Sequence, residues 1–169
     1  MSLSADTATL LFLDFEASSL SQNSWPIEIG CSRLIKGKTV TRSSLIKPSL
    51  NWDLDDWNLA AQKVHGIALK DLEGAPPAID VARVFYPDLS SCMVFSDQPE
   101  FETHWLNRLL GVADLAPVPV QHFSQALEEI LSDRQLDFYH ERLMRLPAPH
   151  RAGPDSARFT EALRYALTM

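Results

Sequence analysis

Two carboxylates stand one residue apart at the end of an apolar run near the start of the chain. Asp14 and Glu16 follow the apolar residues 10–13 and precede the turn-prone pair at 18–19, a pattern that predicts a buried strand. Alternate residues of a strand share a face, so the two carboxylates lie on one side, roughly 6–7 Å apart. Such a pair repels unless a cation lies between them, and Mg²⁺ takes carboxylate ligands. A surface strand with two solvated acids is the alternative, and the pair taken alone favours it.

Two more carboxylates and a histidine lie where predicted helices begin. The apolar stripe that starts near Pro99 predicts a helix with Glu102 in its first turn. A second stripe at the end of the chain predicts a helix that opens at Asp155, and His150 lies five residues earlier in a stiff, proline-rich loop at 147–154. The positive end of a helix dipole favours a negative charge, so both acids suit these positions.

The remaining patterns predict further strands and helices. Strands are expected at 27–35, 40–46 and 92–95, with a weaker candidate at 117–123. Helices are expected at 52–64, from 76 to just before Pro87, at 125–131 with Ser124 as a cap, and at 134–146. The tripeptide at 36–38 indicates a hairpin, so the first three strands are expected to form a meander.

Composition limits the class of protein. The 169 residues are 46% hydrophobic, enough for one good core, so we expect one domain over residues 1–169 with its core at about 9–168. No apolar run reaches membrane-spanning length and residues 1–6 lack the features of a signal peptide, so we expect no membrane contact and a soluble, cytoplasmic protein. Cys31 and Cys92 are far apart in sequence and are expected to be reduced core residues.

The short acidic and histidine motifs also resemble those of a known family. The triplet at 14–16 reads D-x-E, and residues 150–155 read H-x-A-x-x-D. In order and placement they resemble the motifs of the DEDD family of 3′→5′ exonucleases, in the His subclass (DEDDh) that includes polymerase proofreading subunits. Residues 27–30 and 64–67 are similar to further stretches of that family. The resemblance spans about 10–167 and implies a ribonuclease H-like α/β/α sandwich, with a mixed central sheet of about five strands and helices on both faces.

The sequence departs from the family at two positions. Where the family usually places an aromatic residue and Asp at the start of a helix, this chain has Phe101 and Glu102. We prefer Glu102 as the acid of this motif because its place at the helix start matches both the family and the dipole argument. Asp97 is the alternative ligand. Ala17 occupies a position where the family often has Thr.

The resemblance implies a two-metal hydrolysis of phosphodiester bonds at the 3′ end of single-stranded DNA or RNA. Two divalent ions, Mg²⁺ or Mn²⁺, would be held by Asp14, Glu16, Asp155 and Glu102. One ion would activate a water and the other would stabilise the leaving 3′-oxygen. His150 would accept the proton of the water, since an unperturbed imidazole titrates at about 6.5. By the same similarity, a further group would surround the terminal nucleotide: Ala17, Ser18 and His65.

Several alternatives stay open at this stage. A catalytically weakened relative that binds nucleic acid or acts as a scaffold is the second hypothesis, with Glu102 as its sign. The net charge of −7 argues against binding of a long duplex by phosphate neutralisation, but is compatible with a site for strand ends. Neither the choice between DNA and RNA nor the oligomeric state, monomer or homodimer, follows from the sequence. Minor candidates are Trp25 and Trp52 as substrate contacts and Arg142, Arg145 and Arg151 as phosphate contacts; His104, His122 and His140 are expected to be merely exposed.

Overall fold

The computed structural model describes residues 9–169, and its centre is a five-stranded mixed sheet with the strand order β3-β2-β1-β4-β5. The strands are β1 (Leu10–Ala17), β2 (Pro26–Ile35), β3 (Lys38–Leu45), β4 (Met93–Ser96) and β5 (Val120–His122). The helices are α2 (Leu59–His65), the 3₁₀ helix η2 (Leu69–Leu72), α3 (Ala78–Ser91), α4 (Pro99–Gly111), α5 (Phe123–Ile130), α6 (Asp133–Arg145) and α7 (Ala152–Ala166). Residues 1–6, where we expect no signal peptide, lie outside the described residues.

The first three strands form the predicted meander. β1 pairs antiparallel with β2, and β2 pairs antiparallel with β3. Lys36 and Gly37 connect β2 to β3 with φ angles of 52° and 73°, and two positive φ values in a two-residue turn match the twist of a hairpin. The later strands β4 and β5 add in parallel on the other side of β1, which therefore lies at the centre of the sheet.

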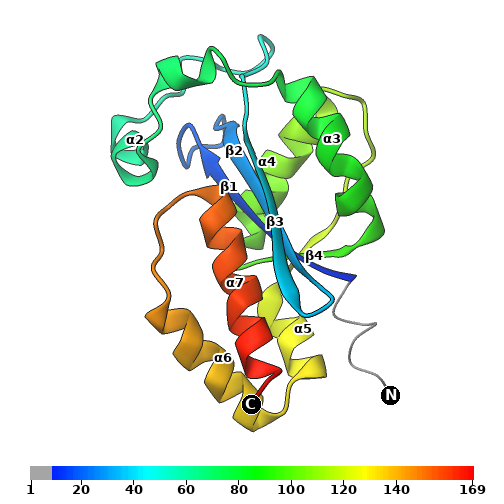
Figure 1. The fold of residues 1–169 in the computed structure, drawn as a ribbon. Helices are drawn as coiled ribbons and strands as arrows, with labels where there is room; N and C mark the ends of the chain where they lie inside the picture. The colour runs from blue at the N-terminus through cyan, green and yellow to red at the C-terminus, as the bar shows by residue number, and fades with distance from the viewer. Residues whose placement is uncertain (1–8) are drawn as a thin grey trace.

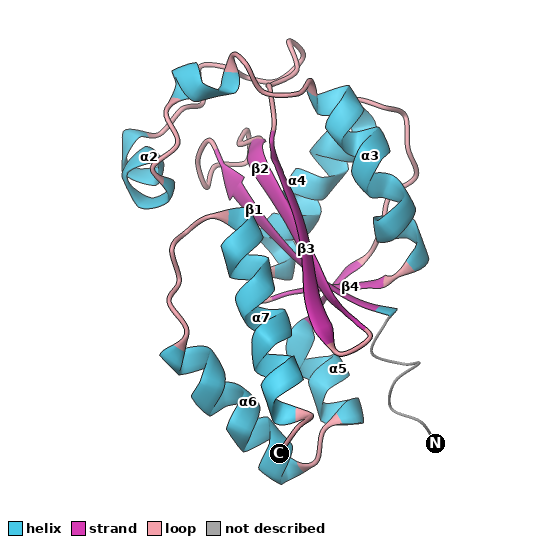
Figure 2. Ribbon diagram, viewed as in Figure 1, coloured by secondary structure: helices cyan, strands magenta, loops and turns pink. Residues whose placement is uncertain are grey.

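Helices cover both faces of the sheet, as the sequence predicts (Figure 1; Figure 2). Leu11, Leu13 and Phe15 of β1 belong to a core with α3 and α4, whereas Leu10 and Phe12 belong to a second core with α5, α6 and α7. Because side chains alternate along a strand, β1 contributes apolar residues to the cores on both faces of the sheet. Asp14 and Glu16 continue the face of Leu10 and Phe12, the face on which α7 packs.

The helix predicted at 52–64 is wrong over its first half. Residues 52–58 form turns, and α2 starts only at Leu59, after Asn58, whose side chain accepts from the backbone N–H of Ala60 at 2.7 Å. Trp25 explains the difference: its indole Nε1 donates to the Asp53 carbonyl at 2.8 Å, and its ring stacks on Trp52. These contacts with a residue far away in sequence hold the segment out of a helix.

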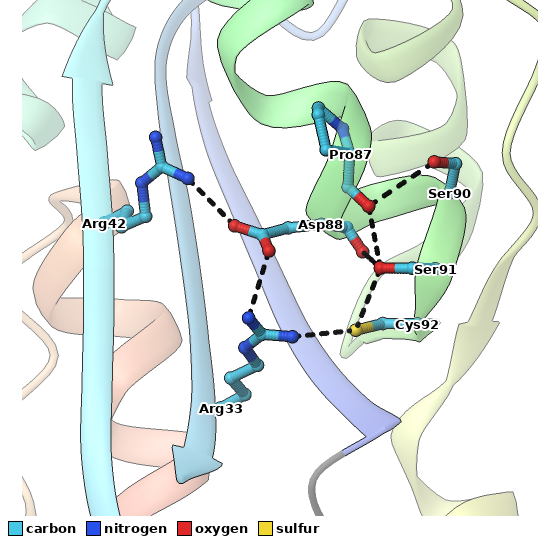
Figure 3. Close-up of polar contacts among 7 residues, drawn as sticks. All are labelled: Arg33, Arg42, Pro87, Asp88, Ser90, Ser91 and Cys92. Carbon is cyan, nitrogen blue, oxygen red and sulfur yellow. Dashed lines mark hydrogen bonds and ion pairs between the residues drawn. The ribbon is translucent and has the colours of Figure 1, made fainter.

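The predicted end of a helix before Pro87 is also wrong, because α3 continues through this proline to Ser91. Phe85 and Leu89 are buried on either side of Pro87, and their burial offsets the cost of the missing backbone hydrogen bond. Asp88 then ties α3 to the sheet by accepting from Arg33 at 3.0 Å and from Arg42 at 2.9 Å (Figure 3).

Smaller differences concern the ends of elements. β5 is the expected weak strand in shortened form, and α5 is capped by His122 rather than by Ser124, since the His122 ring accepts from the Ser124 N–H. α7 begins at Ala152, three residues before Asp155. Cys31 is buried and Cys92 is half-buried, and both are free thiols. None of the helices in the described range 9–169 is long and apolar enough to cross a membrane.

Candidate active site

The acids predicted from the sequence converge on one pocket of about 390 Å³. Asp14 and Glu16 come from the end of central strand β1, and Asp155 comes from the first turn of α7. Glu102 lies in the first turn of α4, and Asp97 follows the end of β4. The pocket is lined by these acids and further residues: Phe15, Leu20, Gln98, Phe101, Trp105, Ala148, His150, Arg158 and Phe159. Three stretches distant in sequence, 14–20, 97–105 and 148–159, therefore meet at one end of β1.

Three of the carboxylates form a tight cluster. One ligand atom from each of Asp14, Glu16 and Asp155 lies within 4.8 Å of the others. Burial raises the pKa of Asp14 well above its usual range, and repulsion from Glu16 and Asp155 raises it further. Burial, with repulsion from Asp155 and Glu28, raises the pKa of Glu16 to about 8. Without a cation the cluster therefore retains protons at neutral pH.

Glu102 lies beside this cluster and is almost fully buried, with 3% of its surface exposed. Burial first, and then the charges of Asp14 and Asp97, raise the pKa of Glu102 well above its usual range. Its Oε2 atom is buried without a hydrogen-bond partner, and so is the Oδ1 atom of Asp155, which forms an ion pair with Arg158 at 3.7 Å. Buried carboxylate oxygens of this kind are costly unless paired, and oxygen ligands suit Mg²⁺ and Mn²⁺. The donor set thus fits a divalent metal site.

His150 lies at the mouth of the pocket. It is exposed, and its φ angle of 53° places it in the left-handed region, which a residue other than glycine adopts only at a cost. The next residue, Arg151, donates its backbone N–H to Asp155 Oδ2 at 3.0 Å. His150 and Asp155 are thereby fixed in the same turn at the start of α7.

The residues predicted to surround a terminal nucleotide do not line the pocket. Ala17 and Ser18 are buried, and Ser18 Oγ accepts from the Trp25 N–H at 3.0 Å. His65 is buried at the end of α2, where its Nδ1 accepts from the Ile67 N–H at 3.0 Å. Burial lowers the pKa of His65. A contact of these three residues with substrate stays a prediction.

Several minor candidates have partners within the protein. Trp25 and Trp52 are buried and stack on each other, and a contact of either with substrate stays a prediction. The three arginines proposed as phosphate contacts also interact within the protein: Arg142 lies over the Tyr165 ring, Arg145 pairs with Glu141, and Arg151 pairs with Glu28. His104 and His122 are half-buried and hydrogen-bonded, and only His140 is exposed as expected.

Two charged residues near the cluster were not predicted as part of the site. Glu28 of β2 is buried and lies opposite Glu16 in the β1–β2 register. Arg158 is the one Lys or Arg among the residues that line the pocket, with a guanidinium nitrogen 3.7 Å from Asp155. A Glu between two buried isoleucines in a central strand could have revealed the first, because a buried charge needs a partner. The second follows the pattern of α7, where it lies one turn after Asp155.

No protein-family model matches the sequence, and no curated protein matches it. The structure, however, matches solved nuclease structures. E. coli exonuclease I in complex with a dA16 oligonucleotide matches 94% of this chain with a TM-score of 0.69 at 11% identity. Exonuclease X in complex with 5′ overhanging duplex DNA matches 94% with a TM-score of 0.60 at 19% identity. The chain has the fold of these nucleases.

Cell-death related nuclease 4 shares the same fold, with a TM-score of 0.64 over 97% of this chain at 16% identity. The chain spans 40% of the length of exonuclease I, 65% of nuclease 4 and 91% of exonuclease X. The predicted ribonuclease H-like α/β fold is thus confirmed.

Proposed function

We propose that this protein is a metal-dependent exonuclease that hydrolyses phosphodiester bonds at the 3′ end of single-stranded nucleic acid. The observation that carries the proposal is the pocket in which Asp14, Glu16 and Asp155 cluster within 4.8 Å, with Glu102 beside them and His150 at the mouth. The shared fold of solved nucleases, two of them in complex with DNA, supports it.

Two divalent ions, Mg²⁺ or Mn²⁺, are the proposed cofactors. Asp14, Glu16 and Asp155 would hold them together with Glu102, with Asp97 as the alternative fourth acid. When bound, such ions neutralise charge on the scissile phosphate and lower the pKa of a water. The raised pKa of Glu16, about 8 without metal, means that loading releases protons from the cluster.

The remaining steps are the attack of a water and two proton transfers, one to His150 and one from solvent. The oxygen of a water forms a bond to phosphorus, and the bond from phosphorus to the 3′-oxygen of the preceding nucleotide breaks. The imidazole of His150 accepts a proton from the water, and the leaving 3′-oxygen takes a proton from solvent. The products are a nucleoside 5′-monophosphate and a strand shorter by one nucleotide.

The rim of the pocket suits an unpaired terminal base. Leu20 and Phe101 line it with 70% and 37% of their surfaces exposed, and the Phe101 ring stacks on Trp105 at 5.6 Å. Apolar and aromatic surfaces of this kind bind the faces of bases without regard to sequence. Arg158 gives the pocket one positive charge for a phosphate.

The proposal is tested by incubating the purified protein with 5′-labelled single-stranded DNA and RNA oligonucleotides, with Mg²⁺, Mn²⁺ or EDTA. The expected result is a ladder that shortens from the 3′ end and is lost with EDTA. His150→Ala should lower the rate by about 100-fold or more, whereas the matched His140→Ala, on exposed α6, should leave it unchanged.

Failure to degrade either polymer with any metal would contradict the proposal. Binding of the oligonucleotides without degradation would instead support the second hypothesis, a catalytically weakened module that binds nucleic acid. Degradation that continues in EDTA would show that hydrolysis does not need a divalent metal.

A further inference from the structure

Glu28 makes three hydrogen bonds to the residues that directly follow His150. Its two carboxylate oxygens accept from Arg151 Nε at 2.9 Å and from Arg151 Nη2 at 2.6 Å. The backbone N–H of Ala152 donates to Glu28 Oε2 at 2.9 Å. The side chain of Glu28 is only 5% exposed and that of Arg151 is 43% exposed, so this bidentate pair is a half-buried and directional contact.

The backbone at His150 needs such an anchor. Its φ angle of 53° is unfavourable for a residue with a Cβ atom, and such a conformation persists only where the surroundings fix it. Residues 147–150 are exposed, so the preceding loop gives His150 little packing. The firm contacts lie on the other side, at Arg151 and Ala152.

Strand β2 therefore acts as the fixed base for this turn. Gly30, two residues after Glu28, lets the backbone of Ala152 approach so closely that an added Cβ would lie 2.0 Å from the Ala152 carbonyl oxygen. Glu28 also lies opposite Glu16 in the register of the sheet. One strand thus sets the position of the turn relative to the carboxylate cluster.

We infer that Glu28 is a positioning residue, which holds His150 over the acidic cluster through Arg151 and Ala152. The inference rests on the proposed function, in which His150 accepts a proton. Glu28 itself has its oxygens engaged by Arg151 and Ala152, so it acts through the turn and not on the substrate.

The test uses Glu28→Gln with Glu161→Gln as a matched control. Glu161 accepts from Arg164 Nε and Nη2 at 2.8 and 2.6 Å, so it makes the same kind of bidentate pair, here within helix α7. Glu161 does not line the pocket. Thermal melting of both variants verifies that they are folded before any rate is compared.

Glu28→Gln should lower kcat by about 10- to 100-fold and leave KM within about twofold of wild type, because a misplaced base slows the chemical step. Glu161→Gln should leave both constants unchanged. In a His150→Ala background, Glu28→Gln should cause no further loss. A further loss of similar size there would show that Glu28 acts through the metal ligands or through general stability, and would overturn the inference.

A second measurement needs no activity. In protein labelled with ¹⁵N-histidine, assigned with His150→Ala, the backbone amide of His150 should relax as part of a rigid turn in wild type and in Glu161→Gln. In Glu28→Gln it should relax as part of a flexible loop. An unchanged His150 amide in Glu28→Gln would overturn the inference. A wild-type protein that hydrolyses nothing would defeat the proposed function alone, while the relaxation data still decide whether Glu28 holds the turn.

Discussion

At the scale of single residues, Glu102 stands where the family resemblance predicts an Asp, and its buried place in the first turn of α4 favours it as the fourth acid of the cluster. Its buried carboxylate has an oxygen without a hydrogen-bond partner, and Asp14 is the first charged group that raises its pKa. Asp97 lines the same pocket but is only half-buried. The carboxylate of Glu102 is thus close enough to the cluster for the charge of Asp14 to raise its pKa.

We therefore expect Glu102→Gln to lower the metal-dependent kcat by about 100-fold or more, because a metal ligand contributes several kcal/mol to transition-state stabilisation. Asp97→Asn is the matched control and should cost less than about 10-fold. Steady-state rates at saturating Mn²⁺ measure both. The reverse order of the two losses would assign the fourth ligand to Asp97.

At the scale of elements, the contact between β2 and the start of α7 sets the geometry of the site. An alanine at position 30 would place its Cβ 2.0 Å from the Ala152 carbonyl oxygen, a backbone atom that moves only with the helix. We expect Gly30→Ala to destabilise the fold by about 3 kcal/mol or more and to lower kcat, since Asp155 moves with α7.

Gly111→Ala is the control for this change, because an added Cβ there meets nothing within 4 Å. It should leave the protein as stable as wild type or stabilise it by about 0.5–1 kcal/mol. Urea denaturation of the three proteins measures the difference. Equal midpoints for Gly30→Ala and Gly111→Ala would show that α7 can move away from β2 without cost.

The elements also show how far sequence patterns carry. Apolar stripes with a period near 3.6 predicted α4, α6 and α7, and the alternation of the D-x-E strand predicted that Asp14 and Glu16 share one face. That this is the face on which α7 packs follows only from the structure. The prediction of a helix over 52–58 was wrong because Trp25, which is distant in sequence, donates a hydrogen bond to that segment. The role of Glu28 depends on the register of β1 with β2 and on the approach of Ala152, and neither is a local property of the sequence.

At the scale of the whole molecule, the chain has a net charge of −7, and the fold places several of its acidic side chains in one pocket. Burial raises the pKa values of Asp14, Glu16, Glu102 and Asp155, and repulsion from neighbouring acids raises those of Asp14, Glu16 and Glu102 further. Arg158 is the one Lys or Arg that lines their pocket. The site thus opposes folding when its acids are ionised, and a divalent cation is the group that relieves the strain.

This opposition predicts how stability depends on pH and metal. The pKa of Glu16 is raised from 4.5 to about 8, so between these values the folded protein holds a proton that the unfolded chain has released. The metal-free protein therefore loses stability as the pH rises from about 4.5 to about 8. Divalent metal binds the ionised cluster, so Tm with Mg²⁺ minus Tm with EDTA should grow between pH 5 and pH 8.

The growth should be at least about 3 °C, since 1 kcal/mol shifts Tm by about 2–4 °C in a chain of this size. Glu16→Gln should flatten the fall of Tm with pH in EDTA and weaken the effect of Mg²⁺. Glu161→Gln should keep both, because the pKa of Glu161 is lowered by Arg164 and its contribution changes only in acid. Scanning calorimetry of the three proteins at both pH values measures the effect. A Tm in EDTA that rises from pH 5 to pH 8, in wild type and Glu16→Gln alike, would mean that the cluster is ionised and paired in the folded protein without any metal.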